Sequence, residues 1–239
     1  MRMIVTGVGD AFSVQSFGSS SVVEAPTGLV AIDCPGHALA MYDAASRGSG
    51  VPIRVDRIDD ILLTHLHGDH SNGLEAIGFM RRFLGDAPRR PRVHALPEVI
   101  DRLWEKLAPG MDGNGNGLED YFDPMPLEPG KPRRVAGLEV ECRRARHSIP
   151  TAGFLIADDA GSIGWSGDTE FEQAHIDWLS QASIIVHECG EQFKHTAWTE
   201  LDGLPEAVKA RVRLIHIPDG TTTPEGPMRP LAQGEILEP

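Results

Sequence analysis

The chain has 239 residues, a hydrophobic content of 41% and a charged content of 24%, which is typical of one globular domain or two fused halves with a sizeable core. Its formal net charge of −13 argues against a protein that binds long nucleic acid through the phosphates. No run approaches the roughly 18 apolar residues of a membrane span, and the first residues lack the apolar core of a signal peptide. The three cysteines, Cys34, Cys142 and Cys189, are far apart and without metal-binding spacing, so we expect reduced thiols in a cytoplasmic protein.

Apolar, β-branched runs that alternate with helical patterns predict the secondary structure. The expected strands cover residues 3–6, 21–24, 29–33, 61–64, 92–95, 138–146, 152–157, 162–166, 184–187 and 212–216. The expected helices cover residues 37–47, 72–84, 97–107, 171–180 and 199–209. Strands cluster early and in the middle of the chain, and helices follow each cluster. This order predicts an α/β (α+β) protein with two mixed β-sheets face to face and helices outside, in a single domain over residues 1–239.

Residues 108–134 are predicted to form a flexible loop, because Gly, Pro and Asn dominate their composition. Loops of this length are often lids or binding loops. The segment from Asp112 to Asp123 is similar to a calcium-binding EF-hand loop, but its twelfth position is Asp rather than Glu. Glu119 stands at the usually apolar eighth position, and flanking prolines exclude the helices. A plain loop is the favoured interpretation, and calcium binding and a lid both stay open.

Arginines gather in residues 81–92 and again in residues 143–146. The favoured interpretation is a solvated face in a chain that uses arginine more often than lysine. The alternative is local steering of an anionic substrate.

The segment ILLTHLHGDHSNG, residues 61–73, places four metal-ligating side chains directly after an apolar run. His65 and His67 are two apart on an extended segment and can face the same side. Asp69 and His70 follow in the turn and can reach a second point a few ångströms away. A pair of divalent ions needs about seven protein ligands if water is to complete the coordination. The pattern therefore predicts a metal site whose other ligands lie elsewhere in the chain.

Three downstream positions at strand ends could supply those ligands. His147 precedes a proline-containing turn, Asp168 lies in a Gly-Asp-Thr turn, and His216 closes the last strongly apolar run. Each residue alone is more typical of a structural role. Together with the first group, and in this order, they favour a metal site.

The residues THLHGDH resemble the signature of the metallo-β-lactamase superfamily, whose fold is an αββα sandwich built from two similar halves. The resemblance covers nearly the whole chain. Within the superfamily, the motifs HSIPTAGFLI around His147, SGDT at Asp168, IIVHE and KHT most resemble the ribonuclease Z-like phosphodiesterase branch.

The resemblance implies two metal ions, for which zinc is the best match and manganese or iron are alternatives. The implied ligands are His65, His67 and His147 for one ion, Asp69, His70 and His216 for the other, and Asp168 as the bridge. A hydroxide that bridges the two ions would be the nucleophile.

The resemblance also implies catalytic residues. His195 matches the position of a histidine that donates a proton to the leaving oxygen, a task for which imidazole has a suitable pKa. Glu188 matches a partner that orients an imidazole, and Asp69 belongs with the catalytic residues as well as the ligands. Four further histidines have no matching role and are taken as structural or surface residues. They are His37, His94, His175 and His187.

The chain departs from ribonuclease Z itself, because it lacks the long Gly- and Pro-rich arm with which that family holds transfer RNA. The favoured function is therefore a dinuclear-metal phosphodiesterase acting on a small phosphodiester or short nucleotide. The alternative is a carbonyl-centre hydrolase, such as a lactonase, thioesterase or β-lactamase, which need not use His195. A third class, a diiron redox module or an inactive binding domain, is disfavoured because His67 is not Glu and no ligand is missing. The substrate, the metal and a homodimer stay open.

Overall fold

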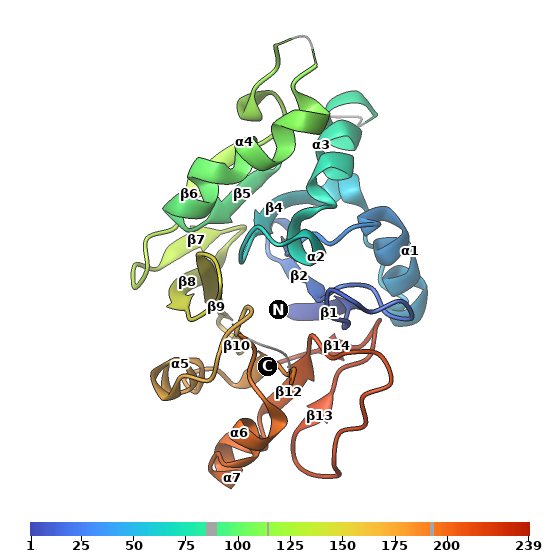
Figure 1. The fold of residues 1–239 in the computed structure, drawn as a ribbon. Helices are drawn as coiled ribbons and strands as arrows, with labels where there is room; N and C mark the ends of the chain where they lie inside the picture. Colours follow the sequence, from blue (N-terminus) through green and yellow to red (C-terminus); the bar gives the residue numbers. More distant parts are fainter. Residues whose placement is uncertain (85–89, 114, 192–193) are drawn as a thin grey trace.

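Two seven-stranded sheets form the centre of the computed structural model, which describes residues 1–84, 90–113, 115–191 and 194–239 (Figure 1). The first sheet has the order β14-β1-β2-β3-β4-β5-β6. Its strands are β1 (Arg2–Gly7), β2 (Ser20–Ala25), β3 (Gly28–Ile32), β4 (Ile58–Leu62), β5 (Arg92–Ala95), β6 (Asp123–Pro126) and β14 (Ile236–Leu237). The second sheet has the order β13-β12-β11-β10-β9-β8-β7. Its strands are β7 (Arg133–Val135), β8 (Leu138–Ala145), β9 (Thr151–Asp158), β10 (Gly161–Trp165), β11 (Ile184–Glu188), β12 (Val212–Ile215) and β13 (Arg229–Pro230).

The two sheets repeat one pairing pattern. The neighbours from β14 to β3 pair antiparallel, and those from β3 to β6 pair parallel. In the second sheet the neighbours from β7 to β10 pair antiparallel, and those from β10 to β13 pair parallel. This confirms the expected mixed sheets. Because parallel strands end at the same edge of a sheet, the loops that follow them gather in one place.

Helices cover the sheets. They are α1 (Ala38–Ser49), α2 (Gly68–Ser71), α3 (Leu74–Phe83), α4 (Pro97–Met111), α5 (Gln173–Leu179), α6 (Trp198–Asp202) and α7 (Glu206–Lys209), with 3₁₀ turns η1 (Val55–Arg57) and η2 (Leu118–Asp120). α1, α3 and α4 lie beside the first sheet, and α5, α6 and α7 lie at the end of the molecule where the second sheet runs (Figure 1). The sequence of α4 explains why this helix packs on the core. Its buried residues recur every four positions and form one apolar face: Val99, Leu103, Leu107 and Met111. None of the described helices is long and apolar enough to cross a membrane.

Two expected helices differ from the structure. The segment 199–209 is split into α6 and α7 around Gly203, Leu204 and Pro205, because proline cannot donate a backbone hydrogen bond inside a helix. The segment 72–84 begins only at Leu74, and the short α2 precedes it.

The expectation of a flexible loop over residues 108–134 is wrong for the part that the structure describes. α4 extends to Met111, and η2, β6 and β7 follow within the segment. Tyr121 and Phe122 are buried at 2% and 0% exposure, and this anchors the segment to the core. Figure 1 shows that α4 runs toward the end of the molecule that lies away from α2. Asn114, part of the EF-hand-like stretch, lies outside the described residues.

Candidate metal centre

The predicted ligands come together at the edge where both sheets end. The loop after β4 carries His65 and His67, and α2 carries Asp69 and His70. From the second sheet, His147 lies between β8 and β9, Asp168 follows β10, and His216 follows β12. These residues form two neighbouring groups that share Asp168, and each group could hold a metal ion.

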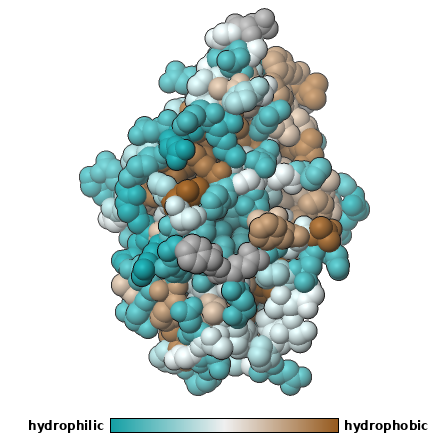
Figure 2. Space-filling view, in the orientation of Figure 1, coloured by the Kyte–Doolittle hydropathy of each residue, from teal (hydrophilic) through white to brown (hydrophobic). Residues whose placement is uncertain are grey.

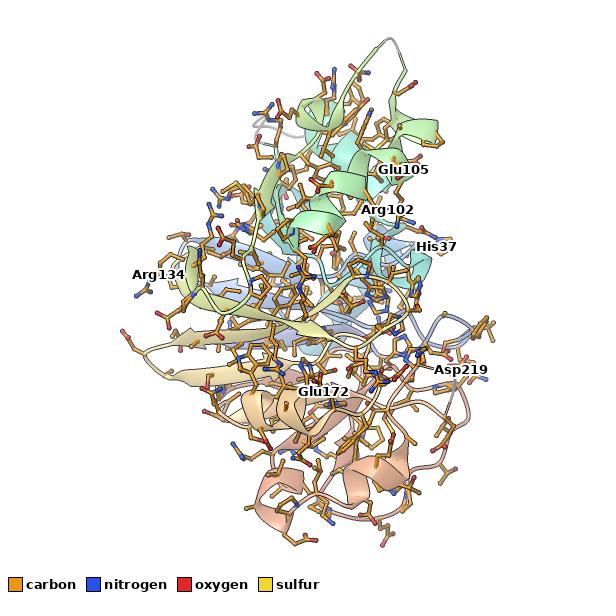
Figure 3. The ribbon with its side chains drawn as sticks, turned by 60° about the vertical axis from the view of Figure 1, so that its left-hand side comes forward. His37, Arg102, Glu105, Arg134, Glu172 and Asp219 are labelled. Atoms are coloured by element: carbon orange, nitrogen blue, oxygen red, sulfur yellow. The ribbon has the colours of Figure 1, made fainter. Side chains whose placement is uncertain are left out.

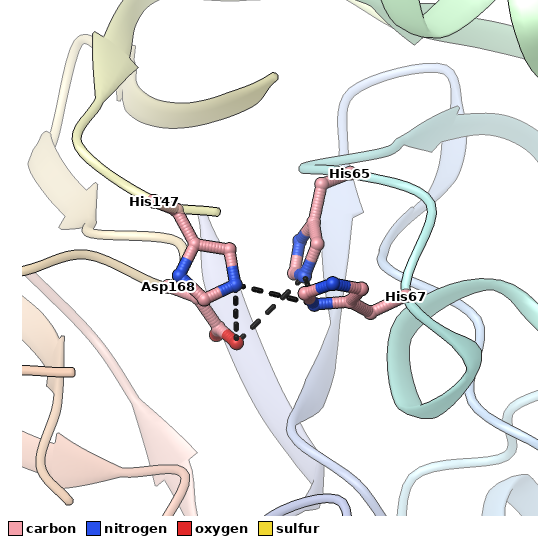
Figure 4. A group of neighbouring side chains, drawn as sticks. All are labelled: His65, His67, His147 and Asp168. Atoms are coloured by element: carbon pink, nitrogen blue, oxygen red, sulfur yellow. Dashed lines mark hydrogen bonds and ion pairs between the residues drawn. The ribbon is translucent and has the colours of Figure 1, made fainter. Parts of the chain in front are cut away.

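The first group consists of three imidazoles and one carboxylate that converge on one point (Figure 4). The Nδ1 atom of His67 lies 3.0 Å from Nε2 of His65 and 3.2 Å from Nε2 of His147. The Oδ2 atom of Asp168 lies 3.7 Å and 3.9 Å from the same two nitrogens. A tetrahedral ion with bonds of about 2.0–2.1 Å holds its ligand atoms about 3.3 Å apart, so these spacings fit a divalent metal.

The second group has two carboxylates and two imidazoles. The Nε2 atom of His70 lies 3.3 Å from both Asp69 Oδ2 and Asp168 Oδ1. The Nε2 atom of His216 lies 3.2 Å from Asp69 Oδ2 and 3.5 Å from Asp168 Oδ2. Oδ1 of Asp168 thus lies near His70 of the second group, while Oδ2 lies between the two groups. His70 Nε2 is buried, and although two carboxylate oxygens lie 3.3 Å away, neither is aligned for a hydrogen bond with it, as expected of an atom placed for a metal.

Asp33 supports the second group, and the sequence interpretation did not identify it. Its buried carboxylate accepts hydrogen bonds from the Thr64 backbone N–H at 2.8 Å and from the Thr64 hydroxyl, and it lies 2.8 Å from His70 Nδ1. Burial raises the pKa of Asp33, and the charge of His70 opposes this rise. Since Nδ1 of His70 is held by Asp33, Nε2 is the nitrogen left for a metal. The sequence signal that could have identified Asp33 is its position, since it is an acidic residue directly after the apolar strand β3.

The backbone at this edge adopts an uncommon conformation. Asp33 and His216 have φ angles of 58° and 57°, in the left-handed region that residues other than glycine rarely adopt. Such backbone is maintained only when its surroundings hold it, and it occurs often at functional sites. The fold therefore fixes the direction of both side chains.

His195 and Glu188 form a pair beside both groups. Glu188 ends β11, is 1% exposed, and its Oε1 accepts a hydrogen bond from the Thr169 backbone N–H at 2.6 Å. The same oxygen lies 3.0 Å from His195 Nδ1. The His195 ring stacks on His216 with centroids 5.0 Å apart, and it lies 5.3 Å from the ring of His147. Burial raises the pKa of Glu188 to about 7, because its effect outweighs that of the hydrogen bond with His195, which by itself lowers the pKa.

The imidazoles differ in protonation. Burial lowers the pKa of His65 and lowers that of His147 to about 4, so both are neutral at pH 7, as a metal ligand must be. Burial also lowers the pKa of His216, but the Asp168 charge and the Asp69 hydrogen bond raise it more strongly, to about 9. His216 therefore carries a proton when no metal is bound.

The four remaining histidines lie outside these groups. His175 and His187 are buried, His94 lies 2.7 Å from the buried carboxylate of Asp60, and His37 is exposed before α1.

Several arginines of the two basic segments form ion pairs. Arg81 pairs with Asp59, Arg92 with Asp60, and Arg144 with Glu98. Arg89 lies outside the described residues. Arg92 and Arg144 are exposed, as the favoured interpretation of a solvated face expects, whereas Arg81 is buried.

Comparison with known proteins shows which family the chain belongs to. Residues 1–235 match the family described as "Anti-Pycsar protein Apyc1". A member from Paenibacillus sp. (strain J14) is 31% identical over 232 residues, which cover 92% of this chain and 90% of that protein. The "cGMP-dependent 3',5'-cGMP phosphodiesterase A" of Dictyostelium discoideum is 27% identical over 192 residues, 73% of this chain but 21% of that protein. Among solved structures, the metallo-β-lactamase fold protein YhfI from Bacillus subtilis has a TM-score of 0.81 at 15% identity and covers 100% of this chain and 99% of its own.

The fold is therefore the metallo-β-lactamase fold, as the sequence predicted. With its cluster of histidines and aspartates, which fits divalent metal, and with these relatives, the protein is a metal-dependent phosphodiesterase. It belongs to the family of the Anti-Pycsar protein Apyc1.

Proposed function

We propose that the chain, as one domain, hydrolyses a 3′,5′-cyclic nucleotide at a centre that holds two divalent ions, with zinc as the best match. The observation that carries the number of ions is the Asp168 carboxylate, which lies between the two groups: Oδ2 is near His65 and Oδ1 is near His70. The substrate class is supported by the relative from Dictyostelium discoideum, whose name gives 3′,5′-cGMP as its substrate.

The proposed ligands are those of the two groups. One ion would be held by His65, His67 and His147, the other by Asp69, His70 and His216, with Asp168 available to both. Bound divalent ions supply Lewis-acid stabilisation of the phosphate oxygens and lower the pKa of a nearby water. Asp33 holds His70 in the required orientation.

His195 is the proposed proton donor to the leaving oxygen. Its Nδ1 faces the buried Glu188 carboxylate, which fixes the ring and stabilises its protonated form. Burial by itself lowers the pKa of His195, but the hydrogen bond and charge of Glu188 raise it overall. The imidazole is thereby kept able to give a proton near neutral pH.

The test of the substrate class is a panel assay. The wild-type protein is reconstituted with zinc or manganese and offered 3′,5′-cyclic nucleotides, a nitrophenyl phosphodiester, lactones and thioesters. We expect hydrolysis of the cyclic nucleotides, with metal-free protein inactive. Rapid lactone or thioester hydrolysis without phosphodiesterase activity would instead assign the centre to carbonyl chemistry.

The test of His195 compares two leaving groups. Removing a positioned general acid costs about 10²–10⁴ in rate, so His195→Ala should lose that much turnover on a cyclic nucleotide while it keeps its metal. The loss should be much smaller on the nitrophenyl diester, whose leaving group hardly needs a proton. His37→Asn, at an exposed histidine with left-handed backbone, is the matched control. Equal loss on both substrates would assign His195 to phosphate binding.

A further inference from the structure

A cavity of about 320 Å³ opens beside the metal centre. Its walls come from α4 and from the two loops that carry the first group of ligands. The lining residues are Leu66, Glu98, Val99, Arg102, Glu105, Lys106, Ile149 and Pro150. Leu66 lies between His65 and His67, and Ile149 follows His147 by two residues. A substrate whose phosphate lies at the metal centre therefore has this cavity within reach of its remaining atoms.

The walls combine apolar and charged side chains. Leu66, Val99, Ile149 and Pro150 are apolar, and Figure 2 shows apolar surface below the position of α4, bordered by hydrophilic surface. Glu98, Glu105 and Lys106 lie four, three and four residues from Arg102, which places all four around one face of α4. This composition suits a flat aromatic ring with a polar edge.

Arg102 lies on the outer part of this face. It is exposed, and Figure 3 shows it with Glu105 on the same helix. Its Nε lies 3.5 Å from a Glu105 carboxylate oxygen, and the two side chains are 60% and 74% exposed. An exposed pair of this kind contributes little to stability, so the guanidinium can turn to a ligand at small cost.

Lys106 lies one turn further along α4, on the side of the metal centre. Its Nζ donates a hydrogen bond to the Asn72 side chain at 3.0 Å. Burial lowers the pKa of Lys106 overall, although the negative charge of the nearby Asp69 opposes this shift. The face of α4 thus carries the exposed Arg102 and, one turn further on, Lys106 near Asp69.

We propose, on the basis of the function proposed above, that this cavity holds the base and ribose of the nucleotide and that Arg102 determines affinity for the base. The apolar walls contact the faces of the base, and Arg102 donates hydrogen bonds to the carbonyl or ring-nitrogen acceptors on its edge. Lys106 faces the ribose and phosphate.

Two other cavities serve this purpose less well. One of about 360 Å³ lies on the other side of the centre, between Cys189 and the loop 218–224. Glu191 is the sole charged residue among those that line it in the described part of the chain, so this cavity offers no cationic donor comparable with Arg102 or Lys106. One of about 500 Å³ lies between α1 and α3, and none of the ligand loops lines it.

The experiment compares two substrates with the same leaving group: a 3′,5′-cyclic nucleotide and a ribose 3′,5′-cyclic phosphate with hydrogen in place of the base. The measured quantity is the ratio of their kcat/KM values, with metal content as a check on folding. Arg102→Ala should lower this ratio about tenfold or more, through KM, as the loss of a charged hydrogen-bond donor predicts. Ile149→Trp, which fills the cavity, should lower it in the same direction. Thr222→Trp, in the cavity next to Cys189, is the matched control and should leave the ratio unchanged.

An unchanged ratio in both Arg102→Ala and Ile149→Trp would overturn the inference, as would a fall confined to Thr222→Trp. A wild-type protein that hydrolyses neither cyclic substrate would refute the proposed function, and this inference with it. Active wild type with an unchanged ratio refutes the inference alone.

Discussion

Replacing Asp33 with Asn tests how the second group of ligands is held in place. The carboxylate accepts from the Thr64 backbone N–H at 2.8 Å through Oδ1, and it lies 2.8 Å from His70 Nδ1 through Oδ2. Because Nε2 of His70 faces the metal position, Nδ1 carries the proton and donates. Asn keeps the size of the side chain and tolerates the left-handed backbone at this position. It has a single oxygen, so either the Thr64 backbone N–H at the Oδ1 position or the His70 N–H at the Oδ2 position must lose its acceptor.

The magnitude follows from that lost acceptor. An unsatisfied buried donor costs about 1–3 kcal/mol of unfolding free energy. In a chain of this size each kcal/mol lowers Tm by roughly 2–4 °C, so we expect a decrease of about 2–12 °C in the metal-free protein. Loss of a group that orients a metal ligand also weakens metal binding by about 10–100-fold.

Two measurements check this prediction: thermal unfolding of the metal-free protein and metal affinity by competition with a chromogenic chelator. Asp60→Asn is the matched control, because Asp60 is a buried aspartate of the same sheet that pairs with Arg92 and His94. It should lose stability and keep its metal affinity. Wild-type metal affinity in Asp33→Asn would refute the role given to Asp33, and so would an equal loss of affinity in both variants.

Four further predictions concern the metal centre. Asp168→Ala should lose both ions, because its oxygens face both groups, and elemental analysis that still finds two ions per chain would exclude it as the bridge. Metal binding at pH 7 should release protons, since His216 has a pKa of about 9 without metal, above its usual 6.5, and calorimetry in buffers of different ionisation enthalpy measures the number. By the same raised pKa, His216 stabilises the metal-free protein fully below about pH 6.5, and this contribution is lost as pH rises through about 9, which urea unfolding across that range can follow. The triple variant Cys34→Ser, Cys142→Ser and Cys189→Ser should keep its metal, because these buried thiols belong to none of the ligand groups among the described residues, and a folded variant without metal would reveal a missed thiolate ligand.

The sequence by itself determined the identity of the candidate ligands. The group from His65 to His70 is recognisable because its members are neighbours in the chain, where spacing limits which side chains can converge. His147, Asp168 and His216 were recognisable because each follows an apolar strand. The alternation of strands and helices likewise predicted two mixed sheets, since burial of one face leaves a periodic pattern in the chain.

Only the tertiary structure decided which atoms meet. His147 and His67 are 80 positions apart and His216 and Asp69 are 147 apart, so no local spacing relates them. The role of Asp33 depends on the adjacent strand end that brings Thr64 and His70 to it.

The ordered strands within residues 108–134, which sequence analysis took for a flexible loop, exist because long-range packing of Tyr121 and Phe122 outweighs a composition rich in Gly and Pro. The cavity beside the metal centre also depends on long-range packing. α4 and the two ligand loops are distant in sequence, and they form walls only once both sheets have packed against each other.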